Sequence, residues 1–139
     1  MTFQIMRFQY TLTGTSLNVV RTDCLAALAD RLAGRVDVLV CNPPYVETAE
    51  EETGSTGIAA AWAGGSRAGR GLTDRVIALC PAVLSGRMGR CYMVAEECNR
   101  PAEVAEFARG LGLSCVEIMR RRCGREMLYV LKIERARTE

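Results

Sequence analysis

Four consecutive residues, Asn42-Pro43-Pro44-Tyr45, combine the groups needed to hold a planar NH2 group in place. Such a nitrogen offers two N–H donors and, in an amide, is a weak nucleophile because its lone pair is delocalised into the carbonyl. The side-chain oxygen of Asn42 and the backbone carbonyl of Pro43 can accept the two hydrogens, and the Tyr45 ring can cover the flat group. The two prolines restrict the loop, so it loses little entropy on binding. The pattern predicts alignment of a nitrogen for reaction, with no general base required.

The four residues follow a short apolar run, Val36 to Cys41, which is rich in β-branched side chains. This run predicts a buried strand. Two successive prolines cannot extend a central strand, because each lacks the N–H that the ladder requires. The chain must therefore leave the sheet at Asn42. This places the loop at the C-terminal end of a strand, where open α/β sheets bind their ligands.

The rest of the sequence predicts an α/β fold, with strands and helices in alternation and an antiparallel hairpin at the end. Asp23 is expected to cap the first helix, and Pro81 to kink or shorten the second. An acidic loop over residues 47–57 and a glycine-rich stretch over residues 64–71 are expected to be flexible. The predicted strands are Leu17–Arg21, Val36–Val40, Arg90–Ala95, Leu113–Met119 and Met127–Ile133, and the predicted helices are Cys24–Leu32, Leu72–Leu84 and Pro101–Leu111.

Asn-Pro-Pro-Tyr after an apolar strand resembles the signature of amino-methyltransferases that use S-adenosylmethionine. Further segments resemble the eukaryotic and archaeal branch of the HemK family, which methylates the side-chain amide of a glutamine in peptide-chain release factors. The resemblance runs from about Leu17 to Lys132, and residues 1–16 have no match. The matching segments are Gly57-Ile58, Ala60-Ala61-Trp62-Ala63-Gly64-Gly65, Gly69-Arg70, Gly124, Glu126 and Val130-Leu131-Lys132.

The resemblance implies a partial Rossmann-like class I methyltransferase sheet, mostly parallel, with a C-terminal antiparallel hairpin. In the family, the first two strands carry a glycine-rich turn and an acidic residue that hold the cofactor. No Gly-x-Gly follows a strand before Asn42 in this sequence. Residues 17–139 are therefore interpreted as the C-terminal part of a methyltransferase domain, truncated at its N-terminal side, and residues 1–16 as an unmatched segment.

Site residues follow from the resemblance residue by residue. Asn42, Pro43, Pro44 and Tyr45 match the catalytic loop, and Asn42 also borders the cofactor. Asp23 matches the family's acidic residue that binds the adenine amino group of S-adenosylmethionine, with backbone help from its neighbour, here Cys24. An N-cap role for Asp23 is compatible with this one.

The resemblance also implies partners. The substrate would be a release-factor protein, and the strand 17–21 would be the sheet edge that joins a small zinc-binding activator subunit in a heterodimer. An unpaired edge strand is a template for such sheet extension.

Composition limits the remaining possibilities. The chain has 139 residues, a net charge of +2, seven cysteines and no histidine. One domain is expected. The cysteines lack the close spacing of zinc sites and favour buried small side chains, so no metal site is predicted. No apolar run is long enough to span a membrane and no signal peptide is recognisable, which predicts a cytoplasmic or nuclear protein.

Two other functions remain open from sequence. An adenine N6-methyltransferase needs the same two acceptors and a stacking ring, although the low net charge and aromatic content make nucleic acid the less favoured partner. A truncated, non-catalytic product is the other alternative, because the cofactor turn is absent. Trp62 is expected to pack or to serve a substrate loop, and Arg120-Arg121-Arg122 with Arg125 to form a solvated turn or a phosphate site.

Overall fold

The computed structural model describes residues 14, 18, 20, 22–54, 58 and 61–136. Its centre is a four-stranded sheet in the order β1-β4-β6-β5. The strands are β1 (Val38–Cys41), β4 (Arg90–Glu96), β5 (Leu113–Cys123) and β6 (Glu126–Arg135). β1 pairs with β4 in parallel, and β6 pairs antiparallel with both β4 and β5. β1, β4 and β5 thus run in one direction and β6 in the other, so the predicted α/β sheet, mostly parallel with a C-terminal antiparallel hairpin, is confirmed.

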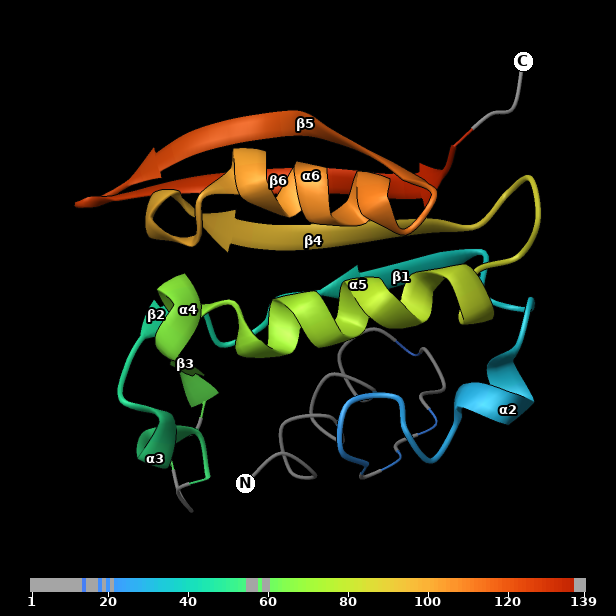
Figure 1. The fold of residues 1–139 in the computed structure, drawn as a ribbon, viewed down its shortest axis with the longest axis horizontal. Coiled ribbons are helices and arrows are strands. Elements are labelled where there is room, and N and C mark those ends of the chain that lie inside the picture. The colour runs from blue at the N-terminus through green and yellow to red at the C-terminus, as the bar shows by residue number, and fades with distance from the viewer. Residues whose placement is uncertain are drawn as a thin grey trace.

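Two helices, α5 (Gly71–Val83) and α6 (Pro101–Gly110), cover one face of this sheet (Figure 1). Their apolar side chains meet those of the strands in a single core. Burying a side chain such as that of Ile77 stabilises the fold by about 1.5–3 kcal/mol. Fully buried members of this core include Ile77 and Cys80 from α5, Val104 and Ala108 from α6, Cys91 and Met93 from β4, and Ile133 from β6.

β1 differs from the predicted buried strand. Leu39 and Cys41 pack against the core, but Val38 is 61% and Val40 is 73% exposed. The cause is the position of β1 at one edge of the described sheet, with a helix over only one of its faces. The prediction of a strand before Asn42 is confirmed, and the prediction that it is buried is wrong for Val38 and Val40.

The first predicted helix is shorter than expected. Only α2 (Ala29–Leu32) is regular, because residues 24–28 form turns and Cys24 has a left-handed φ of 53°. The predicted cap by Asp23 is also wrong: Leu28 is the N-cap, and the Asp23 carboxylate instead accepts a hydrogen bond from Arg75 at 2.8 Å. The Thr22 hydroxyl accepts a hydrogen bond from the Ala27 N–H at 3.3 Å in the turns that precede α2.

The C-terminal half follows its predictions closely. α5 continues through Pro81 and ends at Val83, so the expected early end does not occur. β5 and β6 extend further than predicted and leave the two-residue turn Gly124-Arg125, where Gly124 has the positive φ of 61° common in short hairpin turns.

Two predictions concern residues at the start of the chain. Most of the segment 1–16 and of the predicted strand Leu17–Arg21 lies outside the described residues. Among the helices that the structure describes, none is long and apolar enough to cross a membrane.

Candidate active site

The loop Asn42–Tyr45 leaves the sheet at the C-terminal end of β1, as predicted. Asn42 is exposed, and its side chain makes no hydrogen bond with any other residue that the structure describes, whereas Pro43 is buried. The Tyr45 hydroxyl donates a hydrogen bond to Glu126 Oε2 of β6 at 3.4 Å. Partial burial and the neighbouring Glu126 carboxylate raise the pKa of Tyr45, so its hydroxyl remains a donor at neutral pH. The loop is anchored behind Asn42, while the Asn42 amide is left available.

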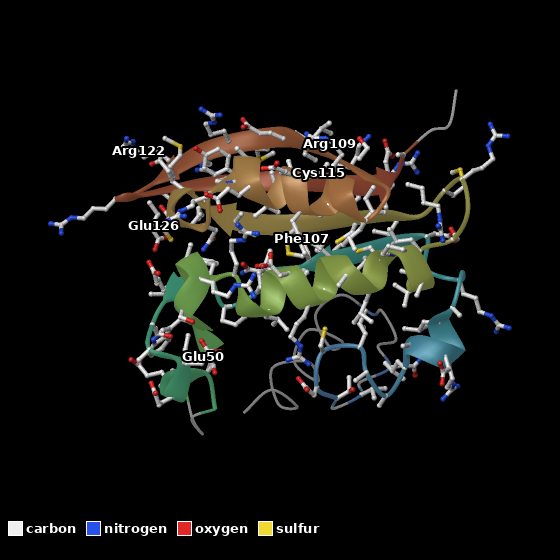
Figure 2. All side chains as sticks on the ribbon, in the orientation of Figure 1. Glu50, Phe107, Arg109, Cys115, Arg122 and Glu126 are labelled. Carbon is white, nitrogen blue, oxygen red and sulfur yellow. The ribbon has the colours of Figure 1, made fainter. Side chains whose placement is uncertain are left out.

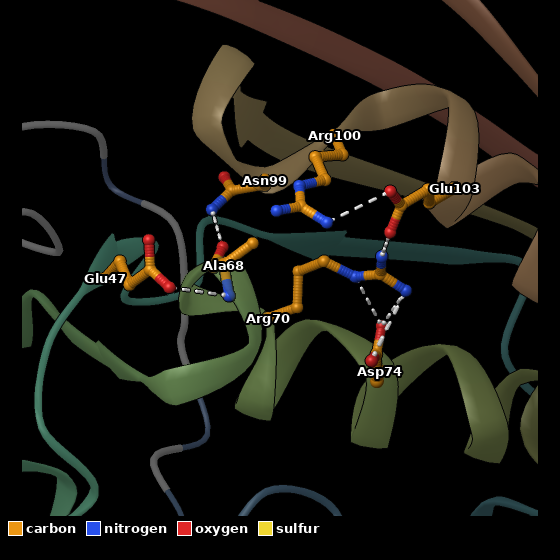
Figure 3. A network of polar contacts seen from close by, with 7 residues as sticks. All are labelled: Glu47, Ala68, Arg70, Asp74, Asn99, Arg100 and Glu103. Atoms are coloured by element: carbon orange, nitrogen blue, oxygen red, sulfur yellow. Dashed lines mark hydrogen bonds and ion pairs between the residues drawn. The ribbon is translucent and has the colours of Figure 1, made fainter.

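A buried amide, Asn99, provides the main anchor. Its Nδ2 donates to the carbonyl oxygens of Tyr45 at 2.8 Å and Ala68 at 2.7 Å, and its Oδ1 accepts from the Glu96 N–H at 2.7 Å. Asn99 is only 1% exposed and ends the short 3-10 helix η2 (Glu97–Asn99), which follows β4. Figure 3 shows its amide directed at Ala68. One side chain thus ties the signature loop to the end of β4 and to the loop around residue 68.

The glycine-rich stretch is tightly packed rather than flexible. A Cβ added to Gly69, which has a φ of 68°, would lie 2.2 Å from the Tyr45 carbonyl oxygen. A Cβ on Gly64 would lie 2.4 Å from the carbonyl oxygen of Gly69. Real Cβ contacts are not this short, so both positions require glycine because another backbone approaches closely. The predicted flexibility is therefore wrong.

The acidic segment after the motif is also ordered where the structure describes it. β2 (Val46–Glu47) pairs in parallel with β3 (Ala63–Gly65), and α3 (Glu50–Thr53) follows β2. Glu50 Oε2 accepts hydrogen bonds from the Ser66 N–H at 3.1 Å and the Ser66 hydroxyl at 2.7 Å, and these bonds lower the pKa of Glu50. Residues 55–57 lie outside the described part, so the predicted mobile loop is wrong for residues 47–54.

These carboxylates hold an unusual backbone. In the segment α4 (Ser66–Gly69), Arg67 and Ala68 both have a φ of 60°, which is rare for residues other than glycine. The Ala68 N–H donates to Glu47 Oε1 at 3.2 Å, and the Ala68 carbonyl is held by Asn99. Strained backbone of this kind persists only where surrounding contacts determine it, and it concentrates at functional sites.

An ion-pair network lies next to Ala68 and Asn99 (Figure 3). The Arg70 guanidinium is nearly buried and contacts Asp74 at 3.2 Å and Glu103 at 3.0 Å, and Arg100 joins Glu103 at 3.2 Å. These contacts fasten the start of α5 to the start of α6. A cleft of about 340 Å³ opens beside the network, lined by Glu47, Arg67, Ala68, Arg70, Arg100 and Glu103.

Comparison with known proteins finds relatives that are similar over most of this chain. No family model matches the chain. It is 45% identical over 117 residues to methyltransferase HEMK2 of Mus musculus, covering 84% of this chain and 54% of that protein. It is 39% identical over 107 residues to the eRF1 methyltransferase catalytic subunit mtq2 of Schizosaccharomyces pombe, covering 76% of this chain and 46% of that protein. The chain is homologous to the HEMK2-type methyltransferases. It spans about half the length of these curated relatives.

A solved structure carries the same fold. The Mtq2–Trm112 complex of E. cuniculi, described as responsible for methylation of the eRF1 translation termination factor, matches with a TM-score of 0.66 and 27% identity. The match covers 97% of this chain and 77% of that one. The sequence resemblance to HemK-type methyltransferases and the α/β class are thereby confirmed.

Of the three residues assigned to the cofactor by resemblance, Asp23 and Cys24 make no hydrogen bond with the loop that contains the third, Asn42. The side chain of Asp23 is 77% exposed and pairs with Arg75 at 2.8 Å, which lowers the pKa of Asp23. Cys24 packs against the core. Neither residue makes a hydrogen bond or an ion pair with Asn42 or Tyr45 in the described structure, so their role in cofactor binding stays a prediction.

Trp62 and the cysteines were also considered in the sequence, and the structure places them as follows. Trp62 is 45% exposed and is no core residue. Cys80 and Cys91 are buried as predicted, but Cys98 and Cys123 are exposed, and the described residues contain no cluster suited to a metal ion. Partial burial and the Glu96 carboxylate raise the pKa of Cys98 to about 12, so it is no thiolate at neutral pH.

Sequence reasoning missed Asn99. Two signals were available: its position three residues after Glu96, with which it forms a capping box, and the Pro101 that begins α6. Neither signal indicates that the same amide reaches residues 31 and 54 positions away.

Proposed function

We propose that the loop Asn42–Tyr45 aligns the side-chain amide of a glutamine in a peptide-chain release factor for N-methylation, with S-adenosylmethionine as the methyl donor. The proposal rests on a difference between the backbone of the loop and the side chain of Asn42. Its backbone is fixed through the Tyr45 carbonyl, whereas the Asn42 amide is exposed and makes no hydrogen bond to a described residue. The names of the relatives, which are methyltransferases including one for eRF1, support the same substrate class.

The chemistry required of the protein is positioning. Asn42 Oδ1 and the Pro43 carbonyl accept the two amide hydrogens, which turns the nitrogen toward the donor methyl. Each neutral hydrogen bond contributes only about 1 kcal/mol, whereas alignment can lower a barrier by roughly 7–11 kcal/mol. The donor supplies an electrophilic methyl group on a sulfonium, and no histidine base is needed.

The described residues do not fit the cofactor's nucleoside. Asp23 is turned to solvent and engaged by Arg75, and no glycine-rich turn precedes Asn42. We therefore infer that the described residues supply the amide-aligning part of the site.

We expect the isolated 139-residue chain to bind S-adenosylmethionine with a dissociation constant above about 1 mM, because no Gly-x-Gly turn precedes Asn42 in the sequence. Isothermal titration calorimetry measures this directly. Micromolar binding would show that other residues of the chain form the cradle.

The proposed function is tested in a chimera in which the part of the mouse relative absent from this chain is fused ahead of residue 17. Transfer of a labelled methyl group to eRF1 should be lost when the acceptor glutamine is replaced. We expect Asn42→Ala to reduce the rate about a hundredfold, as loss of one aligned polar contact does in other enzymes. The affinity for S-adenosylmethionine should stay within about twofold of the parent.

Two results would contradict this role. One is a rate for Asn42→Ala within a few-fold of the parent chimera. The other is methylation of an adenine-containing oligonucleotide in place of the protein, which would reassign the acceptor.

We also propose a heterodimer with a small zinc-binding subunit through the edge strand 17–21, in the cytoplasm or the nucleus. The solved neighbour, a complex of Mtq2 with Trm112, supports a small-subunit partner. Co-expression with such a subunit, followed by size exclusion, tests the pairing, and a variant with proline at Val19 should lose it because proline cannot donate to a sheet ladder.

A further inference from the structure

The tip of the β5–β6 hairpin carries a group of uncompensated charges. Arg121, Arg122 and Arg125, here called the tip arginines, are exposed and form no hydrogen bond or ion pair with any residue in the described part of the chain. Arg120 beside them differs, because it pairs with Glu117 at 2.8 Å and lies over the Tyr129 ring at 4.9 Å. Of the four arginines near the tip, Arg120 is thus paired within the hairpin, and the three tip arginines are not.

The tip arginines stand next to the candidate active site. In the strand register, Arg122 lies opposite Met127 and Cys123 opposite Glu126, so the arginines surround the turn. The Glu126 carboxylate accepts a hydrogen bond from the Tyr45 hydroxyl at 3.4 Å. This bond connects the start of β6, next to the tip, with the signature loop. Figure 2 shows Arg122 and Glu126 at the same end of the hairpin.

Apolar side chains continue this surface along β5. Val116, Ile118 and Met119 are 44%, 50% and 58% exposed, and a bulge separates Glu117 from Met119. Val116, Met119 and Arg121 lie opposite Lys132, Val130 and Leu128, on the face of the sheet that is turned away from the buried Tyr129 and Leu131. Val116, Met119 and Arg121 therefore share this face, whereas Arg122, opposite Met127, lies on the other face and Arg125 lies in the turn between the two strands. The tip and the aliphatic face that continues it are here called the hairpin patch.

We propose that this patch docks an acidic, partly apolar segment of the protein whose amide the Asn42 loop aligns. The inference rests on the proposed function and adds the chemistry of substrate recognition to it. Guanidinium groups bind carboxylates through paired N–H donors. Three like charges at one hairpin tip repel each other, and the carboxylates of a bound partner would offset this repulsion.

The composition of the patch favours a protein over RNA. Single-stranded nucleic acid binds to exposed aromatic rings on which bases stack. Within the described hairpin the aromatic residue, Tyr129, is buried and its ring is covered by Arg120. Exposed aliphatic side chains beside arginines are instead typical of protein interfaces.

The test uses the full chain and fluorescence anisotropy with three labelled probes. The first is a peptide with a central glutamine flanked by two glutamates and one leucine on each side. The second has glutamines in place of the glutamates, and the third is a uridine oligonucleotide of equal charge to the first. The triple variant Arg121→Gln, Arg122→Gln, Arg125→Gln is compared with Arg31→Gln, Arg35→Gln, Arg87→Gln. This control removes the same charge from exposed arginines elsewhere.

We expect the acidic peptide to bind better than the neutral one, with an affinity that falls as salt is raised. The tip variant should weaken its binding about tenfold and the control variant less than twofold, because exposed ion pairs contribute modestly and add up over three sites. Equal binding of the two peptides, equal loss in both variants, or tighter binding of the oligonucleotide would overturn the proposal.

The outcome separates the two proposals. Arginine-dependent peptide binding without methyl transfer in the chimera would support the docking patch and reject the proposed function. Methyl transfer to eRF1 that is unchanged in the tip variant of the chimera would reject the docking patch and support the function.

Discussion

Replacing Asn99 by aspartate is expected to lower the free energy of unfolding by about 4 kcal/mol at neutral pH. The Asn99 amide donates to two carbonyl oxygens, of Tyr45 and Ala68, at 2.8 and 2.7 Å, and is 1% exposed. A carboxylate of the same shape has no hydrogen to donate. The substitution therefore removes two hydrogen bonds and places a buried negative charge against two carbonyl dipoles.

The same substitution predicts a pH dependence of known sign. Burial and the two carbonyl oxygens raise the pKa of the introduced carboxylate in the folded state above its unfolded value of about 3.9. The folded form then binds a proton more tightly than the unfolded form. The variant should recover stability relative to the parent as pH falls from 7 toward 4, because the protonated group donates one hydrogen bond again.

Asn99→Ala is the matched control. It loses the same donors without introducing a charge, so we expect a loss of about 2–3 kcal/mol that does not change between pH 7 and 5 relative to the parent. Urea unfolding of parent and variants across this range measures both effects. A loss below about 1 kcal/mol for Asn99→Asp would show that the signature loop does not depend on this anchor.

The parts of the fold that the sequence predicts well depend on short-range chemistry. Two successive prolines end β1 at Asn42 whatever surrounds them. Pro101 and Gly110 bracket α6, and alternating residues along β4 put Cys91, Met93 and Ala95 into the core. Each of these outcomes follows from a backbone constraint or a periodicity contained within a dozen residues.

The mistaken predictions concern long-range packing. An apolar run such as Val38–Cys41 fits a strand covered on both faces or on one, and the sequence does not say which. Asp23 has the residue type of a helix cap, but Arg75, 52 positions away, holds its carboxylate in the structure. Residues 64–71 show many glycines, and composition alone does not distinguish freedom of φ from the absence of a side chain at a crowded position.

That distinction leads to the second large effect. We expect Gly69→Ala to lower the free energy of unfolding by about 3–4 kcal/mol. Two costs combine at this position. An alanine with the observed φ of 68° adopts a left-handed conformation, and its Cβ would lie 2.2 Å from the Tyr45 carbonyl oxygen. Because that oxygen is also held by Asn99 at 2.8 Å, the signature loop cannot move away without losing its anchor.

Gly112→Ala separates the two costs. Gly112 has a similar φ of 74°, but no atom lies within 4 Å of an added Cβ. Its substitution should therefore cost about 1–2 kcal/mol, the conformational part alone. The difference between the two variants measures the steric contact with Tyr45. Trp62 is the one tryptophan of the chain, and its carbonyl accepts a hydrogen bond from the Val46 N–H at 3.0 Å. Its fluorescence therefore reports on the position of the loop, and displacement of the loop should change the Trp62 emission only in Gly69→Ala. Equal losses in both variants would mean that the loop yields to the methyl group, and the rigid backbone on which alignment by Asn42 depends would then be absent.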